Sequence, residues 1–308
     1  MKLLTNSDPP SLQEVEDRID ELRNIDLKTV DIDVIKELLV LLFRGYVNQT
    51  PKLKLGQPIY RGVLCYEKPD QVTQLSYPPK EVVKFLGRIN RPGESIFYGC
   101  TSRQAIFYEL GLKSGDKIAV SKWTMKSQPL LNNVGYTSES FNQLKSSRVV
   151  PSWSIMKEDF KTKVNEIVKE FFSQELTKRI EQGEEYLYKL SIAIAEKHFE
   201  DEIFAGLIYP SVAMHAEVDN MAIKPQYVDK YMCIEKVQYI QVNKHEKEFE
   251  YNITVLDSAE SFGRDGEIEW KGPPQKWILD KTGDFLIFRV ENGTWVARNE
   301  TGDIVEPS

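Results

Sequence analysis

The sequence predicts a mixed α/β protein of the α+β kind, because helical and strand-like hydrophobic periods occupy different stretches of the chain. Apolar residues recur at helical spacing before residue 50 and again between residues 157 and 199. Short apolar runs, alternating or continuous and bounded by Gly, Pro and Asn, occupy the stretches 57–123 and 206–298. Segregation of helices from strands along the chain is typical of α+β folds.

Residues 1–50 are predicted to form a helical extension. Ser11 and Glu14 have the spacing of a capping box, in which each side chain bonds the backbone N–H of the other residue. The apolar residues that follow at helical spacing are Leu12, Val15, Ile19 and Leu22. A second helix is predicted over residues 33–46. Two interpretations stay open: a helical pair packed on a larger domain, or a helix that binds a partner.

Strands and short helices are expected to alternate between residues 57 and 123. The segments PIYRGVLCYE, SIFYGCT and KIAVSKW are apolar and bounded by turn residues, so each predicts a strand. A short helix is expected over residues 80–86. The segment SRQAIFYELGL predicts a helix that begins with Ser102 as its cap and stops at Gly111.

The stretch 125–200 is dominated by two predicted helices. KEDFKTKVNEIVKEFFSQELTKRI has one continuous apolar face, and Gly183 ends it. A second helix is predicted over residues 186–199. His198 lies on the apolar face of that helix, which favours a packed helix residue over a catalytic base.

The C-terminal part returns to strand patterns. KVQYIQV predicts one strand, and FEYNITV alternates with Phe249, Tyr251, Ile253 and Val255 on one side. DFLIFRVENGTWVARN predicts a hairpin, because Asn292-Gly293 suits the two positive-φ positions of a type I′ turn. Residues 246–308 are thus expected to form a small β-appendage or the edge of the main sheet.

Composition restricts the class of protein and of ligand. The 308 residues are 41% hydrophobic and 28% charged, as in ordinary globular proteins, and no apolar run approaches the length of a membrane span. The net charge of -7 argues against nucleic acid as a main partner and requires a local Arg or Lys to hold any anionic ligand. Scattered Cys65, Cys100 and Cys233 and the lack of a signal-peptide pattern predict a cytoplasmic protein. The amphipathic segments permit a homodimer without requiring one.

The sequence contains few of the known catalytic motifs. The three histidines and three cysteines lack ligand spacing, so no metal site is predicted. There is no P-loop, no Gly-rich dinucleotide fingerprint and no G-x-S-x-G nucleophile turn. What remains is a set of polar residues in strand-like or turn-like settings: Arg61, Arg88, Asn90, Tyr98, Glu109, Ser211 and Asn220.

The order and context of these residues resemble the RES domain family, which is named for an Arg, a Glu and a Ser in that order along the chain. The Arg matches Arg61 in IYRG, and the Ser matches Ser211 in GLIYPSV. The Glu matches Glu109 in GRINRPGESIFYGCTSRQAIFYE, which is similar to the family's Gly-Arg-x-Asn, Pro-Gly turn, apolar-Tyr strand and Ala before the Glu. Asn220, followed by MAIKP, resembles the next family segment.

The resemblance covers residues 57–242 as a catalytic domain, with residues about 125–200 as a helical insertion. Residues 1–50 and 246–308 lie outside it, and Val218-Asp219-Asn220 stands where the family tends to have Gly-x-Asn. The resemblance implies an ADP-ribosyltransferase-like split β-sheet that holds NAD in a cleft. It also implies a toxin that consumes NAD by hydrolysis or phosphorolysis, and an antitoxin or regulatory protein as partner.

The residue types suit that chemistry. Arg61, with Arg88 second, offers a planar cation for the NAD pyrophosphate. Glu109 would stabilise the positive charge that develops on the ribose as the nicotinamide leaves, much as in glycoside cleavage. Ser211 would hydrogen-bond the substrate near that ribose, and Tyr98 would stack on nicotinamide. Asn90 and Asn220 complete the set expected to bind NAD.

Two other functions stay open at the sequence level. The chain could transfer ADP-ribose to a protein or nucleic acid, with the inserted helices and the β-rich tail docking the target. It could also be a non-catalytic NAD-binding module or regulatory scaffold. Labelled ADP-ribose on a discrete acceptor would indicate ADP-ribosyl transfer. NAD binding without loss of NAD would indicate a non-catalytic module.

Overall fold

The computed structural model describes residues 9–51, 54–247, 250–271, 275–280, 285–291 and 294–298. The chain divides into two compact units, each assembled from three stretches. The helical unit comprises Met1–Leu53, Pro78–Ile96 and Gln128–Pro225, and the sheet unit comprises Lys54–Tyr77, Phe97–Ser127 and Gln226–Ser308. Both units draw on the stretch 57–242, so the domain boundaries proposed from the sequence stay predictions.

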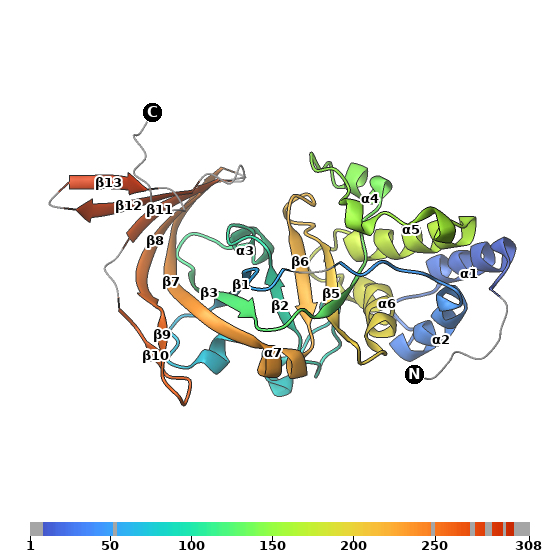
Figure 1. The fold of residues 1–308 in the computed structure, drawn as a ribbon, viewed down its shortest axis with the longest axis horizontal. Helices are drawn as coiled ribbons and strands as arrows, with labels where there is room; N and C mark the ends of the chain where they lie inside the picture. Colours follow the sequence, from blue (N-terminus) through green and yellow to red (C-terminus); the bar gives the residue numbers. More distant parts are fainter. Residues whose placement is uncertain are drawn as a thin grey trace. The chain divides into compact units, whose positions relative to one another are not determined.

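The sheet unit is built on a run of eight described strands with antiparallel neighbours, in the order β13-β12-β11-β8-β7-β3-β1-β2. Their bounds are β1 Ile59–Leu64, β2 Phe97–Cys100, β3 Lys117–Met125, β7 Met232–Lys247, β8 Glu250–Ala259, β11 Gln275–Asp280, β12 Phe285–Glu291 and β13 Thr294–Arg298. A separate pair joins β9 Ser261–Phe262 to β10 Ile268–Glu269. Figure 1 shows β7 as a long curved strand alongside β8. The short helix α3 Ala105–Glu109 and most of α7 Pro225–Tyr231 also belong to this unit.

The helical unit combines helices with a smaller set of strands in the order β6-β5-β4. The helices are α1 Leu12–Asn24, α2 Ile32–Phe43, α4 Ser138–Gln143, α5 Lys163–Thr177 and α6 Lys189–Phe199, and the strands are β4 Leu130–Asn133, β5 Phe204–Pro210 and β6 Asp219–Ile223. Strand β5 pairs antiparallel with β6 and parallel with β4. The described fold is therefore α+β, as the sequence predicts, whereas the ADP-ribosyltransferase-like arrangement stays a proposal.

The four longer helices of the helical unit pack on one another through apolar stripes. Figure 1 shows α1 and α2 beside α5 and α6, and α1 contacts α2 and α5 while α2 contacts α6. Helix α1 begins with the predicted capping box: Ser11 N donates to Glu14 Oε2 at 2.8 Å and Glu14 N donates to Ser11 Oγ at 3.3 Å. Its buried positions are Val15, Ile19 and Leu22, and those of α2 are Ile32, Ile35, Leu39 and Leu42. The two helices thus pack on each other and on α5 and α6 within the helical unit.

Strand β5 depends on a glycine where β5 and β6 approach closely. A Cβ at Gly206 would lie 2.0 Å from the carbonyl oxygen of Ala222, far inside van der Waals contact. Gly206 is paired with Ile223 in the register, so the clash would fall on backbone that cannot move without opening the pair. Only glycine fits here, and the apolar run after it continues as strand to Pro210.

Some local expectations need correction. Helix α3 has Gln104 as its N-cap and not Ser102, whose hydroxyl donates instead to Gln104 Oε1 at 2.7 Å. The predicted helix over 80–86 is only the 3₁₀ turn Lys80–Val82. The predicted C-terminal hairpin is confirmed by the pairing of Glu291 with Thr294, although its turn, residues 292–293, lies outside the described residues.

The extent of the described helices bears on the membrane question. Within the ranges given above, no helix combines the length and the apolar character that crossing a bilayer would require.

Candidate functional site

Arg61 is a partly buried cation of the sheet unit. Its Nε donates to the carbonyl oxygen of Ser76 at 2.9 Å, and its Nη1 donates to the carbonyl oxygen of Tyr98 at 2.8 Å. The guanidinium carbon lies 5.2 Å from the centroid of the Phe97 ring. Burial lowers the pKa of Arg61 to about 10. Among the described residues no carboxylate forms an ion pair with it, so its charge is held by neutral carbonyl groups alone.

Arg61 lies next to the residue of β1 that pairs with β2. The registered pairing of these strands is the single pair Tyr60 with Cys100. One position further along β1, the Arg61 side chain donates a hydrogen bond to the carbonyl oxygen of Tyr98 on β2. The Arg61 guanidinium thus links β1 to β2 beside the registered pair, through a side-chain hydrogen bond.

Glu109 lies at the end of α3, which packs on β1. A Cβ at Gly62 would lie 2.2 Å from Ile106 Cγ2 and 2.9 Å from Leu110 Cδ1, so the missing side chain of Gly62 admits the helix. Because successive side chains alternate along a strand, α3 covers the face of β1 opposite to the one from which the Arg61 side chain emerges. Glu109 itself is exposed. The structure therefore places Arg61 and Glu109 on adjoining elements but not on one face of the strand.

Tyr98 and Cys100 share the α3 face of β2, since they are two positions apart. Burial, and secondarily the charge of Glu109, raises the pKa of the Cys100 thiol, which locates the carboxylate in the neighbourhood of that thiol. Tyr98 is half-buried. Of the residues predicted from the sequence, Tyr98 and Glu109 are thus the pair associated with one face of the sheet unit.

Arg88 and Asn90 lie in the helical unit and have structural partners there. Arg88 Nη1 donates to the carbonyl oxygens of Leu176 and Lys178, at 2.7 and 2.9 Å, and so caps the C-terminus of α5. Asn90 is 6% exposed and its Nδ2 donates to the carbonyl oxygen of Arg91 at 3.1 Å. These bonds give both residues a role in the fold. That they bind NAD stays a prediction.

Ser211 begins a tight turn after β5. Its Oγ accepts from Met214 N at 2.9 Å, and its backbone N–H donates to the carbonyl oxygen of Val218 at 2.9 Å. Within the turn, His215 and Ala216 have φ of +52° and +61°, which side chains with a Cβ rarely adopt. Backbone strain of this kind is concentrated at functional turns, although the hydroxyl of Ser211 has a structural bond of its own.

The far side of this turn is held by a half-buried ion pair that the sequence analysis did not predict. Arg148 donates from Nη1 and Nη2 to the two carboxylate oxygens of Asp219, at 2.7 and 3.0 Å, and Tyr136 OH donates to Asp219 Oδ1 at 2.9 Å. Arg148 Nη1 also reaches the carbonyl oxygen of Ala216 at 3.3 Å. Asn220, next in the chain, pairs with Tyr209 in the β5–β6 register and is 7% exposed. Asp219 thus fixes the position of Asn220.

Replacing Asp219 with Asn is expected to lower the free energy of unfolding by roughly 2 kcal/mol, because Arg148 and Tyr136 lose a charged acceptor in a mostly buried site. Urea unfolding followed by circular dichroism measures the change. The matched control is Glu158→Gln, which breaks the 2.6 Å pair with Lys161 where the glutamate side chain is 84% exposed. That control is expected to change stability by less than about 0.5 kcal/mol. Equal effects of the two substitutions would contradict the structural role given to Asp219.

A second buried polar group lies within the helical unit. His198 of α6 contacts the rings of Phe43 and Phe172, at 5.0 and 5.8 Å between centroids, and its Nδ1 lies 2.8 Å from the carbonyl oxygen of Ile194. That bond assigns the ring proton to Nδ1, and Nε2 has no hydrogen-bond partner among the described residues. Burial lowers the pKa of His198 to about 4. His198 is therefore a neutral, packed helix residue, as predicted.

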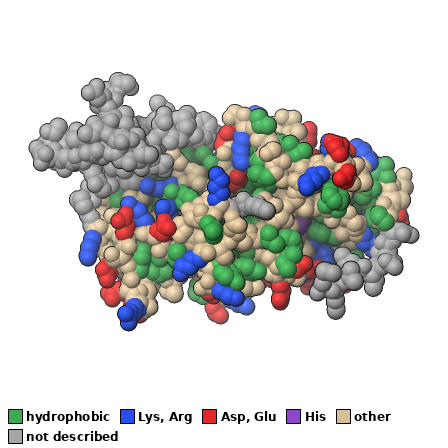
Figure 2. Space-filling view, viewed as in Figure 1, with side chains coloured by type: hydrophobic (Ala, Val, Ile, Leu, Met, Phe, Trp, Pro, Cys, Tyr) green, Lys and Arg blue, Asp and Glu red, His purple; other side chains and the backbone are tan. Residues whose placement is uncertain are grey.

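The distribution of charged side chains on the surface bears on how an anionic ligand could be held. On the face shown in Figure 2, acidic and basic side chains are interspersed among apolar ones. The net charge of -7 makes the average field unfavourable for an anion. An anionic ligand would therefore depend on individual groups such as Arg61. In the described part of the chain, no three His, Cys, Asp or Glu side chains gather as metal ligands would.

Comparisons of this chain with protein-family models, with curated proteins and with solved structures found no match.

Proposed function

We propose that the chain is a RES-type enzyme that consumes NAD by cleaving the bond between nicotinamide and ribose. The observation that carries the proposal is the partly buried Arg61 guanidinium, which donates to the carbonyl oxygens of Ser76 and Tyr98 and has no carboxylate partner among the described residues. A buried cation without a counter-ion is unfavourable, and a bound anion removes that penalty. The NAD pyrophosphate offers such an anion, in a geometry that suits a guanidinium fork.

The second part of the proposal concerns the carboxylate. Glu109 is exposed at the end of α3, which packs on β1, the strand that carries Arg61, on the face opposite to the Arg61 side chain. A carboxylate at this position can stabilise an oxocarbenium-like ribose. Tyr98, on the α3 face of β2, offers an aromatic surface for nicotinamide. Ser211 and Asn220 are assigned to the substrate by the sequence likeness alone.

Purified protein incubated with NAD is expected to release free nicotinamide, and chromatography measures the amount released. Reactions with and without inorganic phosphate separate phosphorolysis, which gives ADP-ribose phosphate, from hydrolysis, which gives ADP-ribose. Label from NAD that appears in a discrete macromolecular band would instead favour ADP-ribosyl transfer. NAD that stays intact in buffer, in phosphate and in cell extract would overturn the proposal. A raised melting temperature with NAD but no turnover would leave a binding module as the function.

A further inference from the structure

A hollow in the helical unit holds a lysine amine together with apolar and acidic side chains. It has a volume of about 270 Å³, and its lining includes Lys169 and Glu170 of α5 and Val150 and Ile155 of the segment that precedes that helix. The residues assigned to NAD are not part of this lining. The volume is slightly below the range typical of drug-sized ligands, so it suits a molecule of a few carbon atoms.

The amine of Lys169 is held by a neutral group. The side chain is partly buried, and its Nζ donates to the carbonyl oxygen of Ser154. Among the described residues no carboxylate forms an ion pair with it, whereas Lys161, in the same lining, lies 2.6 Å from Glu158. Burial lowers the pKa of Lys169, against a smaller opposing effect of the Glu170 charge. Burial therefore favours the neutral amine, which is the nucleophilic form.

The apolar part of the lining is accessible and lies beside this amine. Ile155 is 51% exposed and Val150 is partly exposed. Ile155 directly follows the 3₁₀ turn Ser152–Ser154, so the hydrogen bond to the Ser154 carbonyl brings the Lys169 amine next to it. Accessible apolar surface next to an amine can retain the hydrocarbon part of a ligand.

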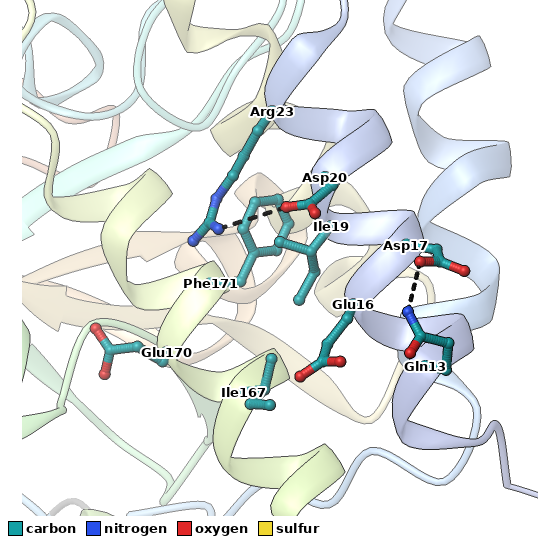
Figure 3. A pocket seen from close by; sticks show the side chains of 9 residues that line it. All are labelled: Gln13, Glu16, Asp17, Ile19, Asp20, Arg23, Ile167, Glu170 and Phe171. Carbon is teal, nitrogen blue, oxygen red and sulfur yellow. Dashed lines mark hydrogen bonds and ion pairs between the residues drawn. The ribbon is translucent and has the colours of Figure 1, made fainter.

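Glu170 supplies a carboxylate to the same hollow. Its Oε1 accepts from Gln174 Nε2 at 3.2 Å, whereas Glu166, the other acid of the lining, lies 4.0 Å from Lys163. Glu170 also borders a neighbouring hollow between α1 and α5, and Figure 3 shows its side chain directed away from Glu16 of α1. A carboxylate within electrostatic reach of an amine can transfer protons while that amine adds to a carbonyl group.

From these groups we propose that Lys169 is a reactive amine that condenses with a small aldehyde carrying an apolar chain. The nitrogen attacks the carbonyl carbon and forms a C–N bond. Both amine protons then pass to the carbonyl oxygen, which leaves as water, and an imine remains. Glu170 relays these protons, and the chain of the aldehyde lies against Val150 and Ile155. The proposal is independent of the NAD chemistry.

The test incubates the full chain with acetaldehyde or pentanal and cyanoborohydride, which reduces the imine to a stable secondary amine. Cyanoborohydride is raised until the rate no longer increases, so that imine formation limits labelling. Peptide mass spectrometry compares Lys169 with Lys163, an exposed lysine of the same helix. Lys169 is expected to be labelled faster. Its advantage over Lys163 is expected to be roughly three- to tenfold larger with pentanal, because the longer chain buries more methylene groups.

Ile155→Ser is expected to remove the preference for pentanal at Lys169 while labelling by acetaldehyde continues. The matched control is Val149→Ser, which changes an 85% exposed valine outside the lining and is expected to keep the preference. Equal labelling of Lys169 and Lys163 by both aldehydes would overturn the proposal. A preference that survives Ile155→Ser, or that both variants reduce equally, would also overturn it.

Glu170→Gln is expected to slow labelling of Lys169 roughly tenfold and to leave Lys163 unchanged, because the proton relay is lost. A carboxylate that acted only through its charge would give the opposite result, since its removal favours the neutral amine. Faster labelling of Lys169 in this variant would therefore contradict the relay assigned to Glu170. Glu139→Gln, at an exposed position of α4 outside the lining, is the control for the change of charge and is expected to have no effect.

Discussion

Glu109→Gln is expected to lower the rate of nicotinamide release from NAD by roughly 10²–10³ while leaving the chain folded. The loss follows because a neutral amide cannot stabilise the positive charge that develops on the ribose, and a preorganised charge of this kind is typically worth that factor. Exposure of Glu109 makes the structural cost small, since exposed substitutions usually change stability by about 0.5 kcal/mol or less. Chromatographic rates at saturating NAD measure the effect.

Glu67→Gln is the matched control, because Glu67 is also an exposed glutamate of the sheet unit. It is expected to retain the full rate. A Glu109→Gln variant that releases nicotinamide as fast as the control would remove the carboxylate from the mechanism, even if NAD is consumed.

Arg61→Lys separates the binding role from the chemical one. Lysine keeps the charge but cannot reproduce the fork that reaches both Ser76 and Tyr98, so KM for NAD is expected to rise more than kcat falls. Glu109→Gln should show the opposite division, with kcat affected most. The two variants together distinguish a pyrophosphate contact from a transition-state contact.

The sequence predicted the local structure of the helical unit well, because local rules determine it. The capping box of Ser11 and Glu14 fixes where α1 begins, and the apolar period fixes which face of α1 is buried. It predicted α3 less well: it placed the cap at Ser102, whose side chain bonds Gln104 instead of the first helical N–H groups. A hydroxyl can either accept from a helical N–H or donate to a neighbouring side chain, so spacing alone does not assign its partner.

The partners of the candidate site residues were beyond prediction. Arg61 binds carbonyl oxygens that lie 15 and 37 residues further along the chain, and Asp219 binds an arginine 71 residues before it. Such pairs follow from tertiary packing, and hydrophobic periods carry no information about them. One signal was present: a glycine inside a strand often marks close approach of another element, and Gly62 next to Arg61 admits α3.

Lowering the pH from 7 to 5 is expected to reduce the free energy of unfolding by roughly 2 kcal/mol through His198 alone. Burial lowers the pKa of His198 from 6.5 to about 4 in the folded chain. The unfolded chain therefore takes up a proton between these values while the folded chain does not. The contribution is fully present above pH 6.5 and is lost as the pH falls toward about 4. Urea unfolding at several pH values measures this slope.

His198→Phe is expected to flatten the profile between pH 7 and 5, because the ring keeps its contacts with Phe43 and Phe172 but no longer titrates. Removal of the unpartnered Nε2 also removes a buried polar atom, so stability at pH 7 should change little. His215→Asn is the control, since Asn tolerates the positive φ of that position and the substitution leaves the His198 environment intact. Parallel profiles for His198→Phe and the unaltered chain would show that His198 is not the group responsible, and the proton uptake would have to be assigned elsewhere.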